Sequence, residues 1–483
     1  MKRSLLSLAI ALAAAALWGC AGAPAQPAKD AATEVPPQWQ TPLPHGGELG
    51  DLQRWWQQFN DPLLNELMSA AQDVNPTLTS AKSRIEQSRA ARVAAGAALV
   101  PKLDANASAL RGQPDLSAPL ATSTSATLQA AWELDVFGAN RAARDAAQAR
   151  LEGASAAWHD ARVLVAAEVA NTYTQLRACE AQLAQTQLDA ASRAETARLT
   201  DLSAKAGFQA PASAALARAS AAQGNATLTQ QHAACELLVK ALVALTGSAE
   251  PALRGRLAAG AAQVPQPAGL ALASVPAAAL AQRPDLYSAA RDVIAASADV
   301  SQAQALRLPR ISLSGSIGAA RLSTGAGTLD GTVWSLGPVA VSLPLFDGGT
   351  RRANVEAARA RYDEAVALYR GKLRTAVREV EEALVALQST AARGDDARVA
   401  AEGFEASYRA TEARYRGGLA SLFELEDARR SAVAAQIALI DLQRERTAAW
   451  IALYRALGGG WSAGDSQPAA AAGPQAVPRR DNA

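Results

Sequence analysis

Hydrophobic and polar positions alternate along the chain with two different periods. Period-two alternation occurs in four stretches and predicts four amphipathic strands, at 102–111, 126–137, 310–321 and 333–346. Elsewhere apolar positions recur at spacings of four and three, the pattern of coiled-coil helices. An example is the series Leu373, Val377, Val380, Leu384 and Leu387. The pattern predicts a mainly helical chain with a small set of strands.

The pattern occurs twice, which indicates an internal duplication. The segment that begins at Asn75 aligns without gaps with the segment that begins at Arg283, and Pro76 and Pro284 are 208 residues apart. Each copy predicts a helix that ends near a proline, two strands, a very long helix and a return helix, in the order α-β-β-α-α. Each long helix extends about 100 Å at the α-helical rise per residue.

Composition shifts and the repeat divide the chain into six expected segments. They are a lipoprotein signal peptide at 1–19, a lipid-anchored tether at 20–54, a first repeat at 55–250 with a helical hairpin at 140–247, a linker at 251–275, a second repeat at 276–460 with a hairpin at 350–457, and a disordered tail at 461–483.

Glycines mark the expected ends of the two long helices. In the first repeat Gly207 is followed by Phe208 and then by Pro211, and proline is well tolerated only at the first turn of a helix. Gly207 therefore ends one helix and Pro211 begins the next. The duplication places Gly417, Gly418 and Leu419 at the same step of the second repeat. We expect a full reversal of direction at both places, with a glycine in the left-handed conformation.

Two cysteines lie symmetrically about the first turn. Cys179 precedes Gly207 by 28 residues, and Cys235 follows it by 28 residues. In an antiparallel helix pair they lie opposite one another, both on apolar seams. They are either two buried thiols or a disulfide, and an oxidising compartment favours the disulfide.

The first twenty residues have the features of a lipoprotein signal. Lys2 and Arg3 precede a short apolar run, and the cut site "LWGC" resembles a lipobox in which Cys20 becomes the acylated first residue, carrying chains such as palmitate. The next residue is Ala21 and not an aspartate, which favours the outer membrane over the inner one.

The rest of the chain contains no apolar run long enough to predict a membrane-spanning helix. A crossing by this chain therefore requires strands that close into a barrel. Four strands do not close a barrel, whereas three copies supply twelve. Trp132 and Trp334 fit either the interface of such a barrel or ordinary sheet packing.

Charge and composition exclude several classes of function. The 47 basic and 45 acidic residues nearly cancel, and no basic run is interleaved with aromatic residues, so nucleic-acid binding has no electrostatic support. The three histidines are scattered, and the sequence has no phosphate loop, metal-ligand spacing or nucleophile elbow. We expect no enzyme activity, no cofactor and no bound metal.

Four motifs carry a family resemblance: "WWQQFNDPLLNEL", "RPDL", "LPLFDGGTRRANVEAARARY" and "RYRGGLASLFELEDARR". In order and spacing they resemble the TolC-like outer-membrane factor family, and more closely its lipoprotein branch of channels in RND-type drug-efflux systems. The resemblance implies a homotrimer with a twelve-stranded β-barrel in the outer membrane, continued by a twelve-helix α-barrel through the periplasm. It also implies a periplasmic membrane-fusion adaptor and an inner-membrane RND-type pump as partners, and passive transport.

The resemblance also implies roles for residues near the second turn. Tyr415 matches a family tyrosine that helps to hold the closed end of the duct, and the position of its carboxylate partner is occupied by Ser213. Glu424 and Asp427 match acidic positions that form rings in the trimer and favour cations. They fit equally the start of a helix, where acidic residues interact favourably with the helix dipole.

Two other functions remain open at the level of sequence. One keeps the duct and changes the cargo to proteins exported by a type I secretion system. The other is a lipid-anchored coiled-coil scaffold, which gives no reason for four amphipathic strands.

Overall fold

The computed structural model describes residues 40–41, 52–113, 120–267, 280 and 282–461. The predicted signal peptide and Cys20 lie outside the described residues, as do most of the predicted tether and tail.

The order of elements reproduces the predicted duplication. The first repeat consists of α3 (Pro76–Ala97), β1 (Lys102–Gly112), β2 (Ala121–Leu134), α4 (Ala139–Lys205) and α5 (Pro211–Thr246); the second consists of α8 (Pro284–Ala305), β3 (Arg310–Thr324), β4 (Gly327–Ser342), α9 (Thr350–Arg416) and α10 (Leu422–Ala456). The helices α3 and α8 have 22 residues each, and α4 and α9 have 67 residues each. A 3-10 helix, η2 (Leu52–Phe59), α2 (Pro62–Val74) and α6 (Glu250–Leu257) complete the described elements.

The chain forms two compact units, which are described separately. The sheet unit comprises Ser83–Ser155 and Ser288–Lys372, and the hairpin unit comprises Glu34–Lys82, Ala156–Tyr287 and the chain from Leu373 onward. The four helices α3, α4, α8 and α9 each contribute residues to both units.

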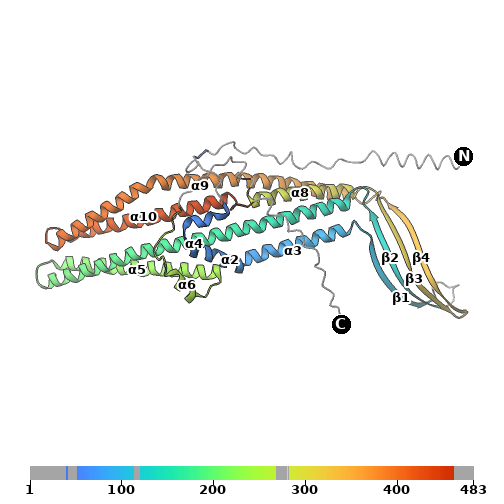
Figure 1. Ribbon diagram of the computed structural model, residues 1–483, viewed down its shortest axis with the longest axis horizontal. Coiled ribbons are helices and arrows are strands. Elements are labelled where there is room, and N and C mark those ends of the chain that lie inside the picture. Colours follow the sequence, from blue (N-terminus) through green and yellow to red (C-terminus); the bar gives the residue numbers. More distant parts are fainter. Residues whose placement is uncertain (1–39, 42–51, 114–119, 268–279, 281, 462–483) are drawn as a thin grey trace, which may run out of the picture. The chain divides into compact units, whose positions relative to one another are not determined.

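The sheet unit contains four antiparallel strands in the order β1-β2-β3-β4 (Figure 1). The register places apolar side chains in rows across one face; one such row is Ala105, Leu128, Ile317 and Trp334. The next row on the other face is polar and consists of Asp104, Gln129, Ser316 and Ser335. Because side chains alternate between the faces of a strand, this register gives the two faces opposite character, as the period-two pattern predicts.

All four predicted strands have different limits in the structure: β1 ends at Gly112, one residue later than predicted, and β3 ends at Thr324, three residues later. β2 begins at Ala121 and ends at Leu134, and β4 begins at Gly327 and ends at Ser342. The last predicted strand begins at 333, but the backbone from Gly327 onward already pairs with β3, which leaves a two-residue turn between Thr324 and Gly327. The predicted end at 346 is wrong because Pro344, which has no N–H, follows soon after the last paired residue.

In the hairpin unit, two antiparallel helix pairs extend to the two turns (Figure 1). One, which we call the first hairpin, consists of α5 and the part of α4 from Ala156; the other, the second hairpin, consists of α10 and the part of α9 from Leu373. A disulfide joins Cys179 on α4 to Cys235 on α5, with 5.6 Å between their Cα atoms. Arg393 on α9 pairs with Glu445 on α10 at 2.8 Å. Each contact joins residues at similar distances along the chain before and after a turn, as expected for antiparallel helices.

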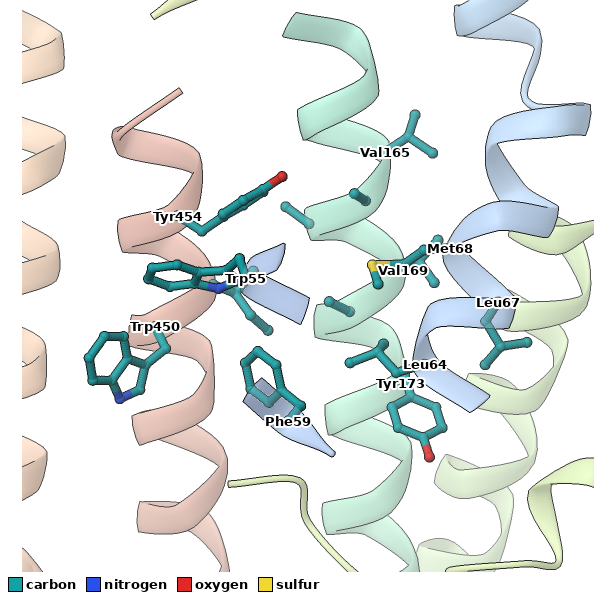
Figure 2. Close-up of a cluster of buried hydrophobic side chains, with 14 of the residues drawn as sticks. Trp55, Phe59, Leu64, Leu67, Met68, Val165, Val169, Tyr173, Trp450 and Tyr454 are labelled. Carbon is teal, nitrogen blue, oxygen red and sulfur yellow. The ribbon is translucent and has the colours of Figure 1, made fainter. Parts of the chain in front are cut away.

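The core of the hairpin unit forms where η2 and α2 pack against both hairpins (Figure 2). Trp55 is 1% exposed, and its ring lies 5.7 Å from that of Trp450 and 5.4 Å from that of Tyr454. On α4, Tyr173 donates a hydrogen bond of 2.5 Å to Asp61, the N-cap residue of α2. The "WWQQFNDPLLNEL" motif therefore supplies core side chains that join the two repeats, each fully buried aromatic or aliphatic side chain contributing about 1.5–3 kcal/mol.

Arg283 of the "RPDL" motif connects α8 to the second hairpin. Its side chain is 7% exposed and donates to Glu379 on α9 at 2.8 Å and to the carbonyl oxygen of Ala456 on α10 at 3.0 Å. It also forms two hydrogen bonds with Asp285. This buried guanidinium fixes the start of α8.

Three of the expected segment limits are wrong in the structure. The predicted linker begins inside α6, because Leu253 and Leu257 are buried against the hairpin unit and give that stretch a helical packing face. The predicted tail begins too early, since Trp461 is 4% exposed and its ring lies 5.2 Å from that of Tyr287. The predicted tether extends too far, since η2 begins at Leu52.

Within the described residues, no single helix carries an apolar run of the length needed to cross a bilayer; α5 and α6 reach that length only in combination, across a bend of 116°.

Candidate functional site

The candidate functional site is the end of the hairpin unit where the two helical turns lie. Both turns have the same hydrogen bonds. In the first, the N–H of Phe208 donates to the carbonyl of Ser203 at 2.9 Å, and in the second, the N–H of Leu419 donates to the carbonyl of Arg414 at 2.8 Å. This bond, from the third residue after a helix back to its last turn, is the Schellman motif, in which the residue before the donor is left-handed.

Only some of the glycines at the two turns adopt the left-handed backbone conformation. Gly207 and Gly418 have φ of 80° and 73°, in the region that glycine enters without steric cost. Gly417 is not among the residues of positive φ, and a Cβ there meets its nearest neighbour, the carbonyl oxygen of Arg414, at an ordinary 3.5 Å. The reversal therefore depends on Gly418, the counterpart of Gly207 in the repeat.

Apolar side chains project from both turns into solvent. Phe208 is 85% exposed, Leu419 is 73% exposed and Phe423, in the first turn of α10, is 72% exposed. Pro211 occupies the first position of α5, as its missing N–H favours. The tip of the hairpin unit thus presents large apolar groups, the kind of surface that typically marks an interaction site.

Tyr415 contacts the first hairpin through a hydroxyl group. Its OH lies 3.1 Å from Oγ1 of Thr200 on α4. The Thr200 hydroxyl donates to the carbonyl of Thr196 at 2.7 Å, so the tyrosine donates to the threonine. Ser213 is half-buried on α5, and no hydrogen bond joins it to Tyr415 in the described residues. The hydroxyl partner of Tyr415 is therefore on the long helix of the first hairpin, at a residue that the sequence did not indicate.

Glu424 and Asp427 have partners within α10. Ser421 and Glu424 form a capping box: the N–H of Glu424 donates to Ser421 Oγ at 3.1 Å, and the N–H of Ser421 donates to Glu424 Oε2 at 2.6 Å. The hydrogen bond from the Ser421 N–H is the largest effect that lowers the pKa of the Glu424 carboxyl, and the Ser421 side chain lowers it further. Asp427 forms an ion pair with Arg430. Glu424 thus caps the start of the helix, and Asp427 pairs with a residue of the same helix.

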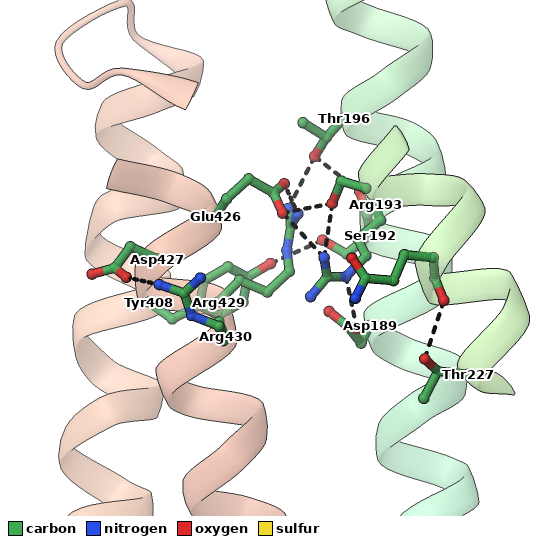
Figure 3. Close-up of polar contacts among 12 residues, drawn as sticks. Asp189, Ser192, Arg193, Thr196, Thr227, Tyr408, Glu426, Asp427, Arg429 and Arg430 are labelled. Carbon is green, nitrogen blue, oxygen red and sulfur yellow. Dashed lines mark hydrogen bonds and ion pairs between the residues drawn. The ribbon is translucent and has the colours of Figure 1, made fainter. Parts of the chain in front are cut away.

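A buried charged cluster that the sequence did not indicate lies deeper between the hairpins (Figure 3). It consists of Asp189 and Arg193 on α4 and of Glu426 and Arg429 on α10, and we call these four residues the charged joint. Arg193 donates to Asp189 Oδ2 at 2.8 Å and to Glu426 Oε2 at 3.3 Å. Arg429, whose side chain is 2% exposed, pairs with Glu426 and donates to Thr196 Oγ1 at 2.9 Å.

A sequence signal for the charged joint exists in the heptad pattern. Arg429 occupies a seam position, because it continues the buried series Leu422 and Leu425 at the spacing of three and four and is followed by buried Ala432. Arg193 lies likewise between buried Ala190 and Ala197. A charge at a seam position indicates a buried partner on another helix, but the pattern does not say which one.

Comparison with known proteins agrees with the duplicated architecture. The sequence profile of the family described as "Outer membrane efflux protein" matches residues 67–248 and 275–459, one segment in each repeat. The chain therefore belongs to the outer membrane efflux protein family.

Relatives and solved structures cover nearly the whole chain. The chain is 32% identical to the outer membrane protein OprJ of Pseudomonas aeruginosa, over 96% of each protein. It is also 32% identical to the pyoverdine export outer membrane protein OpmQ of Pseudomonas putida, over 89% of this chain and 92% of that protein. The solved structure of the outer-membrane channel OprN superposes with a TM-score of 0.78 at 28% identity, over 88% of this chain and 99% of that one. The fold is that of the TolC-like outer-membrane channels.

Proposed function

We propose that the protein is the outer-membrane exit channel of a tripartite efflux system, a passive duct that exports drugs or other small toxic molecules. The observation that carries this proposal is the match of both repeats to the outer membrane efflux family, together with the channel fold. The duct catalyses no reaction and needs no cofactor in this proposal, because an energised partner drives transport.

The proposed assembly is a homotrimer. Two observations on the sheet unit support it. β1 and β4 each pair with only one strand and so present unpaired backbone groups, which a neighbouring copy satisfies. Leu128, Ile317 and Trp334 lie in one apolar row, and they are 47%, 57% and 74% exposed in the single chain. Twelve strands from three copies close into a barrel whose apolar face contacts outer-membrane lipid.

The proposed anchor is an acylated Cys20, which holds the chain to the outer membrane in addition to the strands. The sequence "LWGC" with Ala21 after the cysteine supports it. More than one acyl chain is needed for stable attachment, at about 0.8 kcal/mol per buried methylene group. The helices then form the predicted long periplasmic portion.

The proposed partners meet the two turns. A periplasmic membrane-fusion adaptor contacts the exposed apolar side chains of Phe208 and Leu419, and through it an inner-membrane RND-type pump supplies the cargo. The same end is the proposed gate. Tyr415 holds the closed state through Thr200, Ser213 lies beside the first turn, and the carboxylates of Glu424 and Asp427 form threefold rings that favour cations.

Gene deletion and complementation test this function. We expect the deletion strain to accumulate a small fluorescent efflux substrate several-fold more than the complemented strain, and to become more sensitive to small toxic compounds. Secretion of a protein cargo is measured in the same strains. Unchanged small-molecule accumulation combined with lost protein secretion would replace the proposal with type I export, and no change in either would favour the scaffold.

A further inference from the structure

The charged joint connects the two hairpins through the ion pair of Arg193 with Glu426 and the hydrogen bond of Arg429 to Thr196. Four charged side chains, two of each sign, meet there. Only 2% of the Arg429 side chain and 10% of the Asp189 side chain are exposed. Each charged group has a partner of opposite sign while the cluster stays assembled, although Asp189 Oδ1 and Arg429 Nε are buried without a hydrogen-bond partner among the described residues. Removal of one partner leaves an unpaired charge in a buried site.

The contacts of the joint reach three helices. Glu426 on α10 accepts from Arg193 on α4 and also from the Ser220 hydroxyl on α5, at 2.8 Å. Arg193 donates to the same Ser220 hydroxyl at 2.8 Å. The carboxylate of one hairpin is therefore held by both helices of the other.

The packing around the joint is shaped for these side chains. Gly224 on α5 faces Arg193, and a Cβ at that position comes within 2.9 Å of the Cδ atom of the arginine. The guanidinium of Arg429 lies over the ring of Tyr408 on α9, with 5.7 Å between its Cζ atom and the ring centroid. Each arginine therefore packs against a residue on the other helix of its own hairpin: Arg193 against Gly224 and Arg429 against Tyr408.

Between the joint and the turns, the contacts of the two hairpins are weaker. In the described part of the chain, no ion pair joins the hairpins on the tip side of Arg193. The contacts there include the hydroxyl pair of Thr200 with Tyr415 and a small apolar cluster of Ala197, Ala217, Leu422 and Leu425. Glu195 on α4 and Arg416 on α9 also attract one another electrostatically, without a direct ion pair. A neutral hydroxyl pair is weaker than a charge-assisted hydrogen bond, which is about twice as strong.

We infer that the charged joint is the fixed pivot of the gate: it stays assembled when the tip opens, and the hairpins separate only between the joint and the turns. Arg193 and Arg429 are then positioning residues that set where Tyr415 meets Thr200. The moving part of α4 extends from Arg193 to Lys205, about 18 Å of helix. This inference rests on the proposed function, because a gate requires a duct.

Two matched pairs of hydroxyl residues allow a direct test on the intact chain. Ser192 on α4 and Tyr408 on α9 are 2.9 Å apart beside the joint, and Thr200 and Tyr415 on the same helices are 3.1 Å apart near the turns. Each pair is replaced by two cysteines, and a short bifunctional thiol reagent with a reducible link joins them in cells. The native disulfide leaves no thiol at Cys179 or Cys235 to compete.

The pivot predicts different effects of the two cross-links on efflux of a fluorescent substrate. The link at residues 192 and 408 leaves the efflux rate within two-fold of the value before cross-linking, and the link at 200 and 415 lowers it at least ten-fold, reversibly on reduction. Equal inhibition by both links overturns the pivot, because the hairpins then separate at the joint. No inhibition by either link also overturns it. Absence of efflux before cross-linking, in the wild type as well, overturns the proposed function and the pivot together.

A charge-removal pair provides a second readout that a purely structural role does not change. Glu426→Gln keeps the size of the side chain and removes the carboxylate that Arg193 and Arg429 share, so that Arg429 loses its ion pair while Arg193 keeps Asp189. We expect trimers with an intact disulfide that leak, seen as at least a four-fold lower inhibitory concentration of a large antibiotic that the outer membrane normally excludes. The control Glu402→Gln removes an exposed pair with Arg398 within α9. Equal sensitivity of both variants to the antibiotic overturns the positioning role.

Discussion

Gly207 and Gly418 adopt the same left-handed backbone conformation at the same step of the two repeats, with φ of 80° and 73°. Each ends one of the two 67-residue helices. In both turns the following residue closes the same hydrogen bond back to the helix. The duplication has thus preserved the backbone geometry of the tip, while the residues around it have diverged.

Substitution of the two adjacent glycines separates backbone conformation from packing. We expect Gly418→Ala to destabilise the second turn by about 1–2 kcal/mol, because alanine is strained in the left-handed conformation. Gly417→Ala is the matched control and is expected to be neutral or slightly stabilising, since its position has no such requirement. Thermal unfolding and hydrogen exchange at the second turn measure the difference. Equal effects of the two substitutions would show that the turn does not have this geometry.

The disulfide makes a prediction about oxidation and stability. It closes a loop with a sequence separation of 56 residues, and a cross-link of this kind contributes about 2–4 kcal/mol. Replacement of Cys179 and Cys235 by serine is expected to lower the unfolding temperature of the hairpin unit, as monitored by loss of helical signal. Mass spectrometry of the non-reduced protein provides the independent check, and two alkylated thiols would contradict the bond.

The capping box predicts a pH dependence at the start of α10. The folded-state pKa of Glu424 is lowered, so its contribution is present above the ordinary glutamate pKa of about 4.3 and is lost as pH falls through the folded value. We expect the amide protection of the first turn of α10 to decrease on acidification. Glu424→Gln is the control, because glutamine keeps the capping contact without a titration. If Glu424→Gln lost amide protection at the same pH as the wild type, a group other than Glu424 would cause the pH dependence.

Substitution of Arg283 is expected to lower the free energy of unfolding, because it breaks a buried ion pair. Arg283→Ala removes a buried guanidinium that pairs with Asp285 and Glu379, while Glu379 keeps Arg455 at 3.3 Å. We therefore expect a loss of about 3 kcal/mol, the lower end of the range for breaking a buried pair. Denaturant unfolding of the purified protein measures this loss. Arg352→Ala is the comparison, because Arg352 forms an exposed pair with Glu356, whose loss costs about 1 kcal/mol or less. Similar losses in the two variants would contradict the anchoring role of Arg283.

Local sequence patterns predicted the order of helices and strands. The features that they did not predict depend on contacts between segments that are distant in the sequence. The turns at Gly207 and Gly418 were predictable because glycine and proline act on their own backbone. The start of β4 at Gly327 was not, because its glycines resemble a loop until β3 is present to pair with them. The charged joint escaped prediction because Arg193 and Glu426 are 233 residues apart, and a charge on a helix is usually solvated.

The central claim is that copies of this chain form a hollow duct. Electron microscopy of the detergent-extracted protein, averaged without imposed symmetry, tests it most directly. The account predicts a hollow cylinder with threefold symmetry that narrows at the end carrying the two turns. A solid rod, or a particle without a continuous lumen, would contradict it.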